Sequence, residues 1–332
     1  MMKTLVKSAI GLASPRLPLV RDALEGGLTV FLSHDVAQHP SPFSRECGLA
    51  VDPASFERQV RWIAQEFQVI SLDALLAGHL PPRAALITFD DGFASVFRTA
   101  LPILRRHGLP STIFLNMASV LGEPFWGARA VYLCRHVEGF LEFLAQRAAP
   151  SSGAAFRGHP DGGRSTRTAA RLEAHLHCSP EVVAAWEARC GHQYLAALSD
   201  YTCPFATADD LAAVQDDPLV AFGSHAYHHY SLRVLPDAAV RESLQANAEA
   251  LRPYRNSRPV FAFPFGVSAT GQSELVNALG YERIFTSLPR VNPDPAAGVL
   301  HRIPLTAWHD RRSRLWFQVA RAALDMRHDG RA

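Results

Sequence analysis

One short stretch of the sequence, residues 84–92, restricts the fold more than any other. It reads Ala-Ala-Leu-Ile-Thr-Phe-Asp-Asp-Gly, an apolar run that ends in two adjacent carboxylates and a glycine. A short, continuous and partly β-branched apolar run predicts a buried strand. In α/β folds the functional residues lie at the carboxyl ends of such strands. The stretch therefore predicts an α/β protein with Asp90 and Asp91 at a strand end, although the same residues could simply cap a helix.

A second stretch, residues 219–229, is also an apolar run with polar residues at its end. His225 and His229 lie four residues apart, so on a helical turn they would share a face. Surface polarity or a satisfied buried histidine would explain either residue alone. Taken with an aspartate from the first stretch, however, two imidazoles fit a His-His-Asp site for a divalent metal. Because successive strand residues point to opposite sides, we expect one of the two aspartates to bind the cation and the other to handle a proton.

The third stretch, residues 261–266, reads Phe-Ala-Phe-Pro-Phe-Gly and predicts a strand that ends in a turn. A turn of this kind can direct a backbone N–H at a developing oxyanion. Earlier in the chain, Phe125 and Trp126 form either the wall of a pocket or a packed loop.

Strand-like and helix-like segments alternate along most of the chain, which favours parallel βα units. About seven or eight strands are predicted, which suits a distorted, incomplete (β/α) barrel. The predicted division is an N-terminal amphipathic segment at 1–27, a barrel domain at 28–310 and a C-terminal helix and tail at 311–332. A helical and loop insertion interrupts the barrel at about 123–200.

Composition restricts the partners and the compartment. The chain has 332 residues with 33 Lys and Arg against 31 Asp and Glu, a net charge of +2 that gives no reason to expect nucleic acid. Five cysteines without a CxxC spacing favour a reducing compartment, here the cytoplasm. No apolar run is long enough to span a membrane. Residues 1–12 are predicted to form an amphipathic helix, and such a helix could contact a membrane surface.

The three stretches, TFDDG, HAYHH and FAFPFG in this order, resemble the motifs of the polysaccharide deacetylase family, the NodB-homology domain of carbohydrate esterases. The resemblance covers roughly residues 28 to 310 and implies the family's distorted seven-stranded barrel. It also implies metal-dependent removal of N-acetyl groups from a glycan.

The resemblance assigns a role to each matching position. Asp91, His225 and His229 would hold one divalent metal ion, for which Zn²⁺ is the first choice. Asp90 would be the catalytic base, and the backbone N–H of Phe265, in the turn after Pro264, would stabilise the oxyanion. Trp126 is added as a candidate for substrate binding.

Three departures from the family pattern affect these expectations. Ala226 stands where the family often has a hydroxyl residue after the first histidine. Ala262 stands where the family often has the arginine that tethers the catalytic aspartate, which leaves the anchor of Asp90 open. The late Leu-x-His motif that supplies the general acid is also not evident. We assign this role to His34 at the end of the first strand, with His309 as the alternative and His301 as a third histidine nearby.

The sequence thus predicts a metal-dependent hydrolase that removes N-acetyl groups from an N-acetylhexosamine-containing polysaccharide or glycolipid. An O-deacetylase or a deformylase acting on a lipid-linked sugar would share this metal chemistry and is the alternative among enzymes. A catalytically silent glycan-binding domain is the alternative outside enzymes.

Overall fold

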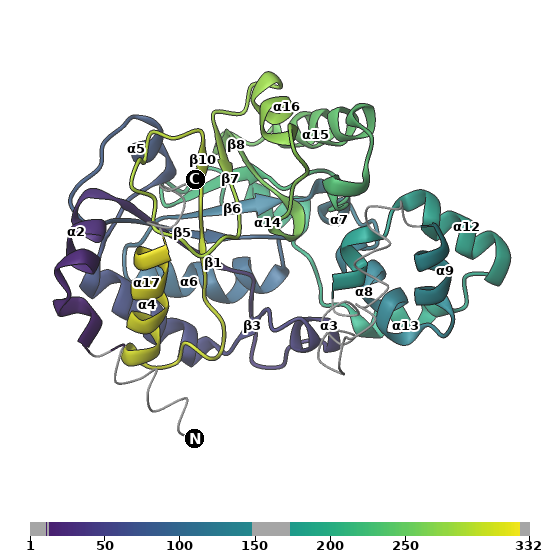
Figure 1. Ribbon diagram of the computed structural model, residues 1–332, viewed down its shortest axis with the longest axis horizontal. Coiled ribbons are helices and arrows are strands. Elements are labelled where there is room, and N and C mark those ends of the chain that lie inside the picture. The colour runs from purple at the N-terminus through teal and green to yellow at the C-terminus, as the bar shows by residue number, and fades with distance from the viewer. Residues whose placement is uncertain (1–10, 12, 148–172, 326–332) are drawn as a thin grey trace, which may run out of the picture.

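A curled sheet of parallel strands organises the chain (Figure 1). The computed structural model describes residues 11, 13–147 and 173–325. Along the sheet the strands lie in the order β10-β9-β8-β7-β6-β5-β1-β11, with β4 pairing with β5 off this path. The strands are β1 (Leu28–Ser33), β4 (Gln68–Val69), β5 (Ala84–Phe89), β6 (Ser111–Leu115), β7 (Val220–Ser224), β8 (Ser257–Ala262), β9 (Arg283–Phe285), β10 (Val299–Leu300) and β11 (Ile303–Pro304).

The two edge strands of this sheet, β10 and β11, do not pair with each other, so the barrel stays open. The predicted incomplete (β/α) barrel is confirmed, with eight strands along the path of the sheet where about seven or eight are predicted. The two edge strands are close in sequence, since only His301 and Arg302 separate β10 from β11.

Helices connect the strands and cover the outside of the sheet (Figure 1). A two-stranded sheet of β2 (Asp35–Val36) and β3 (Ala50–Val51) precedes α4. The main helices around the barrel are α2 (Pro18–Gly26), α3 (Pro42–Glu46), α4 (Pro53–Glu66), α5 (Leu72–Leu76), α6 (Leu101–Arg106), α7 (Met117–Val120), α14 (Ala208–Ala212), α15 (Asp237–Leu251), α16 (Gln272–Ala278) and α17 (Arg312–Asp325). Among the described residues, no helix is long and apolar enough to cross a membrane.

Side chains that cap the helices explain where several of them begin. The Asp52 carboxylate accepts a hydrogen bond from the Ser55 N–H at 2.9 Å, directly before Pro53 opens α4. Thr207 and Asp210 form a reciprocal capping box that starts α14. Each of these caps satisfies N–H groups that would otherwise lack a partner at the first turn.

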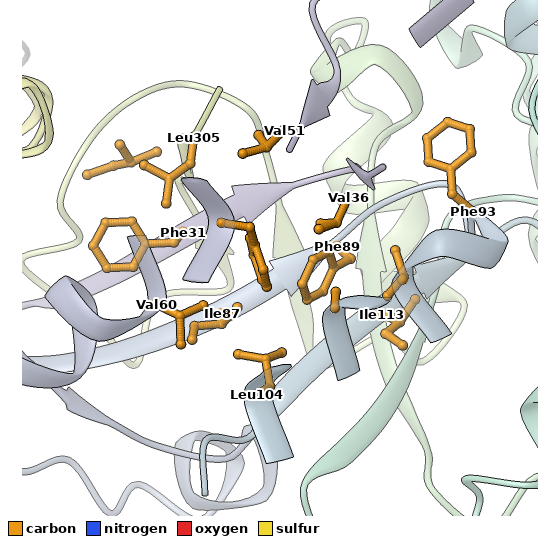
Figure 2. Close-up of a cluster of buried hydrophobic side chains, with 14 of the residues drawn as sticks. Phe31, Val36, Val51, Val60, Ile87, Phe89, Phe93, Leu104, Ile113 and Leu305 are labelled. Atoms are coloured by element: carbon orange, nitrogen blue, oxygen red, sulfur yellow. The ribbon is translucent and has the colours of Figure 1, made fainter. Parts of the chain in front are cut away.

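Alternate residues of the strands fill two apolar layers. From β1 and β5, Phe31, Ile87 and Phe89 pack outward against the helices, together with Val60 of α4 and Leu104 of α6 (Figure 2). The opposite residues, among them Leu86 of β5, Phe114 of β6 and Phe285 of β9, form a second cluster on the other side of the strands. Burial of one such side chain contributes about 1.5–3 kcal/mol, so both layers hold the strands, and therefore the strand ends, in fixed positions.

The region predicted as an insertion forms a helical group beside the barrel (Figure 1). Its elements are α8 (Trp126–His136), α9 (Phe140–Arg147), a 3₁₀ turn η3 (Ala174–His177), α12 (Pro180–Cys190) and α13 (Tyr194–Tyr201). They share a separate hydrophobic cluster that includes Phe140 and Trp186. Helices α8 and α13 both contact α3, so the helical group packs against the segment that connects β2 to β3.

Candidate active site

A cavity of about 520 Å³ lies at the carboxyl ends of the strands. Its floor includes His34 after β1, Asp90 and Asp91 after β5, and His225 and His229 after β7. Helix α3 and the helical insertion form its opposite wall. The structure therefore brings the predicted metal ligands, the predicted base and the predicted acid into one cavity.

Asp91, His225 and His229 form a compact group of three ligands. The Asp91 Oδ1 atom lies 3.1 Å from His229 Nε2 and 3.5 Å from His225 Nε2. One ligand atom from each residue lies within 4.8 Å of the others, and all three residues are buried. His228 is directed elsewhere, with its Nε2 3.5 Å from Glu123 Oε2. His228 is therefore not part of this group.

The histidine segment is a loop and not the helical turn considered from the spacing of its histidines. Ala226 and His229 have φ values of 60° and 62°, and Asp91 and Phe265 have φ values of 71° and 58°. A left-handed backbone is costly for residues with a Cβ atom, and such conformations concentrate at functional sites. Here the loop conformation, and not helical spacing, aims both imidazoles at Asp91.

The polar atoms of this group fit a divalent cation. The His225 Nδ1–H donates to the Ala262 carbonyl at 2.8 Å, so a neutral His225 directs its Nε2 lone pair toward Asp91. No hydrogen-bond partner satisfies Asp91 Oδ1 or His229 Nδ1 within the part of the chain that the structure describes. Two imidazoles and a carboxylate are a common donor set for Zn²⁺.

The ionisation of Asp91 and His229 is also suited to a cation. Burial acts to raise the pKa of Asp91, but the attraction of His229 and the close approach of both imidazoles outweigh burial and hold that pKa below its usual range. Burial lowers the pKa of His229, which favours the neutral imidazole that a metal requires.

Arg302 anchors Asp90, and sequence reasoning missed it. Its Nη1 and Nη2 donate to the two Asp90 carboxylate oxygens at 2.6 and 2.7 Å, and its Nε donates to the Thr286 carbonyl at 3.0 Å. The Arg302 residue is 0% exposed. Burial acts to raise the pKa of Asp90, but the Arg302 guanidinium outweighs it and holds that pKa below its ordinary value. The anchor left open by Ala262 is therefore supplied by the segment between β10 and β11.

The three histidines considered for the acid lie in different places. His34 lines the cavity, whereas His309 is buried outside the cavity lining. The His309 Nδ1 accepts a hydrogen bond from the Thr306 N–H at 3.0 Å, and burial lowers the pKa of His309 to about 4. The His301 Nδ1 is 2.8 Å from the Thr286 hydroxyl. The geometry favours His34 over His309, although the role itself stays a prediction.

The remaining predicted site residues divide between the cavity and the core. Phe265 lines the cavity, where the centroid of its ring lies 4.5 Å from the centroid of the His229 ring, and Pro264 is buried in the same turn. Trp126 is not among the lining residues: it is 5% exposed and packs in the hydrophobic cluster of the insertion. Its neighbour Phe125 lines the cavity instead. Of the two alternatives, Phe125 is thus the pocket wall and Trp126 the packed residue.

The fold and this group of side chains define a class: an incomplete (β/α) barrel with a candidate metal centre at its strand ends. A family model described as "Polysaccharide deacetylase" matches residues 77–126, which include β5 and both aspartates. The predicted resemblance to the polysaccharide deacetylase family is confirmed.

Curated relatives match a short part of the chain. The poly-beta-1,6-N-acetyl-D-glucosamine N-deacetylase of Staphylococcus aureus strain MSSA476 is 30% identical over 81 residues, 23% of this chain and 28% of that protein. The same figures hold for the protein of strain MRSA252. The chain therefore matches these relatives over little more than a quarter of their length.

Solved structures extend the likeness to the whole fold. The structure of IcaB from Ammonifex degensii has a TM-score of 0.56 at 18% identity and covers 88% of this chain and 97% of that chain. The Streptococcus pyogenes deacetylase PplD, solved in complex with acetate, has a TM-score of 0.54 at 13% identity, with 88% and 98% covered. At these identities the likeness establishes the fold alone. The curated relatives are named N-deacetylases, a name that falls within the predicted enzyme class.

Proposed function

We propose that this protein is a metal-dependent hydrolase that removes N-acetyl groups from an N-acetylhexosamine-containing polysaccharide or glycolipid. One observation carries the proposal: Asp91, His225 and His229 form a buried group beside the Asp90 carboxylate. The Arg302 guanidinium binds that carboxylate and fixes its position. Zn²⁺ is the proposed ion because two imidazoles and one carboxylate match its preferred donors. A cytoplasmic location with contact at a membrane surface stays a prediction.

The proposed chemistry assigns each group one task. A divalent ion held by the three ligands would polarise the amide carbonyl and make water a stronger nucleophile at neutral pH. Asp90 accepts the proton of the attacking water, and its bidentate contact with Arg302 fixes the direction of the carboxylate. His34 donates a proton to the departing amine. The Phe265 N–H stabilises the negative charge that develops on the carbonyl oxygen.

The test is release of acetate, or of formate from a formylated substrate, before and after removal of metal with a chelator. N-acetylglucosamine oligomers, O-acetylated oligomers and N-formylated sugars distinguish the three possible reactions. We expect release from the N-acetylated oligomer, its loss after chelation and its recovery with Zn²⁺. Release from the O-acetylated or N-formylated substrate alone would favour the alternative reactions. Binding of oligomers without release from any substrate would identify a glycan-binding domain.

A further inference from the structure

A carboxylate and a guanidinium on the far wall of the cavity have no part in the proposed chemistry. Glu46 ends α3, and Arg135 lies on α8 of the insertion, so the two residues come from opposite sides of the contact between barrel and insertion. Both line the same cavity as the metal group. The Arg135 Nη1 donates to the Glu46 carbonyl at 3.2 Å and lies 3.6 Å from Glu46 Oε2.

Two residues of the insertion hold the Glu46 carboxylate in place. Its Oε2 atom accepts a hydrogen bond from the Tyr201 hydroxyl at 2.8 Å and lies 3.0 Å from His136 Nε2. Burial acts to raise the pKa of Glu46, but hydrogen bonds with His136 and Tyr201 outweigh it and lower that pKa, so the group is ionised at neutral pH. All of these contacts use Oε2, and among the described residues none uses Oε1.

Arg135 likewise keeps hydrogen-bonding capacity. A guanidinium has five N–H donors, and the contacts of Arg135 within the described chain are those with Glu46 and with the Cys47 thiol. Its side chain is 19% exposed, so part of it reaches the cavity. The two residues therefore present an acceptor and donors side by side, in fixed positions, with a combined charge of zero.

We propose that Glu46 and Arg135 form a subsite that binds the hydroxyl groups of the sugar residue next to the one that is deacetylated. Neighbouring hydroxyls of a pyranose both donate and accept, which matches a carboxylate oxygen beside a guanidinium. The zero combined charge favours a neutral sugar over an anionic one. The subsite rests on the proposed function, and it identifies the substrate as an oligomer or polymer instead of a single sugar.

The experiment compares dissociation constants, measured by calorimetry, for N-acetylglucosamine and its β-1,4-linked tetramer. The zinc-loaded protein carries Asp90→Asn so that turnover does not consume the ligand. Arg135→Gln and Glu46→Gln are each expected to weaken tetramer binding by about 10-fold, since a hydrogen bond to a charged group is lost. Binding of the single sugar should change less than 2-fold.

His136→Ala is the matched control, because His136 contacts the same carboxylate without lining the cavity. It should weaken tetramer binding much less than Arg135→Gln does. Equal losses in all three variants, or equal losses for the single sugar and the tetramer, would overturn the subsite, as would no loss or no tetramer binding at all. Tetramer binding with the expected losses but no acetate release by the unmutated protein would contradict the proposed function and leave the subsite standing.

Discussion

Replacing Arg302 by methionine should leave the Asp90 carboxylate buried without its counter-charge. Arg302 is 0% exposed and makes two contacts of 2.6 and 2.7 Å with that carboxylate. At a charge separation of about 4 Å and an effective dielectric constant of about 20, the lost attraction is about 4 kcal/mol. Removing one partner of a buried pair typically destabilises a protein by about 3–5 kcal/mol. We expect a loss of free energy of unfolding in this range at pH 7, with turnover reduced at least about 100-fold because the base is no longer oriented.

Urea unfolding and acetate release measure the two effects, and Arg258→Met is the matched control. Arg258 makes the same kind of bidentate contact, with Asp73, but these side chains are 29% and 57% exposed. An exposed pair contributes only about 0–1 kcal/mol, so this variant should stay close to the unmutated protein in both assays. Arg302→Lys keeps the charge but loses the planar fork, and it should fall between the two. Equal stability and full turnover in Arg302→Met and Arg258→Met would refute the anchoring role.

Three further predictions concern the base, the acid and the pH dependence of stability. Asp90→Asn should retain bound metal and lose about 10²–10⁴-fold in turnover, because an amide cannot accept the proton. If Asp90→Asn loses the metal and Asp91→Asn retains it, the roles of base and metal ligand are reversed. His34→Ala should bind metal normally, turn over slowly and change the alkaline limb of the pH–rate profile. Near-normal rates in His34→Ala, with a large loss in His309→Ala, would instead assign the role of general acid to His309. The pKa of His309 lies near 4 in the folded chain against 6.5 for the ordinary group, so folding stability should rise with pH between these values by about 3 kcal/mol from this residue. His309→Asn keeps an acceptor for the Thr306 N–H and should abolish that rise in urea titrations; an unchanged pH dependence would show that another group titrates.

The strand ends could be predicted because short apolar runs, helix caps and turn residues act locally. Ala84 to Phe89 form β5, as the apolar run at the start of residues 84–92 predicts. Parallel strands bring their carboxyl ends to one edge, so the sequence order of Asp91, His225 and His229 was enough to suggest that they meet.

The anchor of Asp90 could not be predicted because it depends on pairing across the sheet. Arg302 and Asp90 are separated by 212 residues, and they meet because β1 lies between β5 and β11. The available signal was a lone arginine inside an apolar segment, Val299 to Leu305, since a charged side chain in a buried strand requires a partner. The pattern does not say which carboxylate that partner is.

The residues of the far wall of the cavity could not be predicted from the sequence either. Glu46 and Arg135 belong to elements whose contact is set by the docking of the insertion on α3, and neither residue lies in a recognisable motif. Trp126 was assigned to substrate binding for the opposite reason: an aromatic residue beside a loop suggests a pocket, but its side chain fills the core of the insertion.

The most direct test of the account is acetate release as Zn²⁺ is added back to metal-free protein, with an N-acetylglucosamine oligomer as substrate. The account predicts no release without metal, a linear rise with added Zn²⁺ and saturation at one ion per chain. The variant carrying both His225→Ala and His229→Ala should release none at the same concentrations. Full release by the metal-free protein, or by this double variant, would contradict the assignment of Asp91, His225 and His229 as the catalytic metal site.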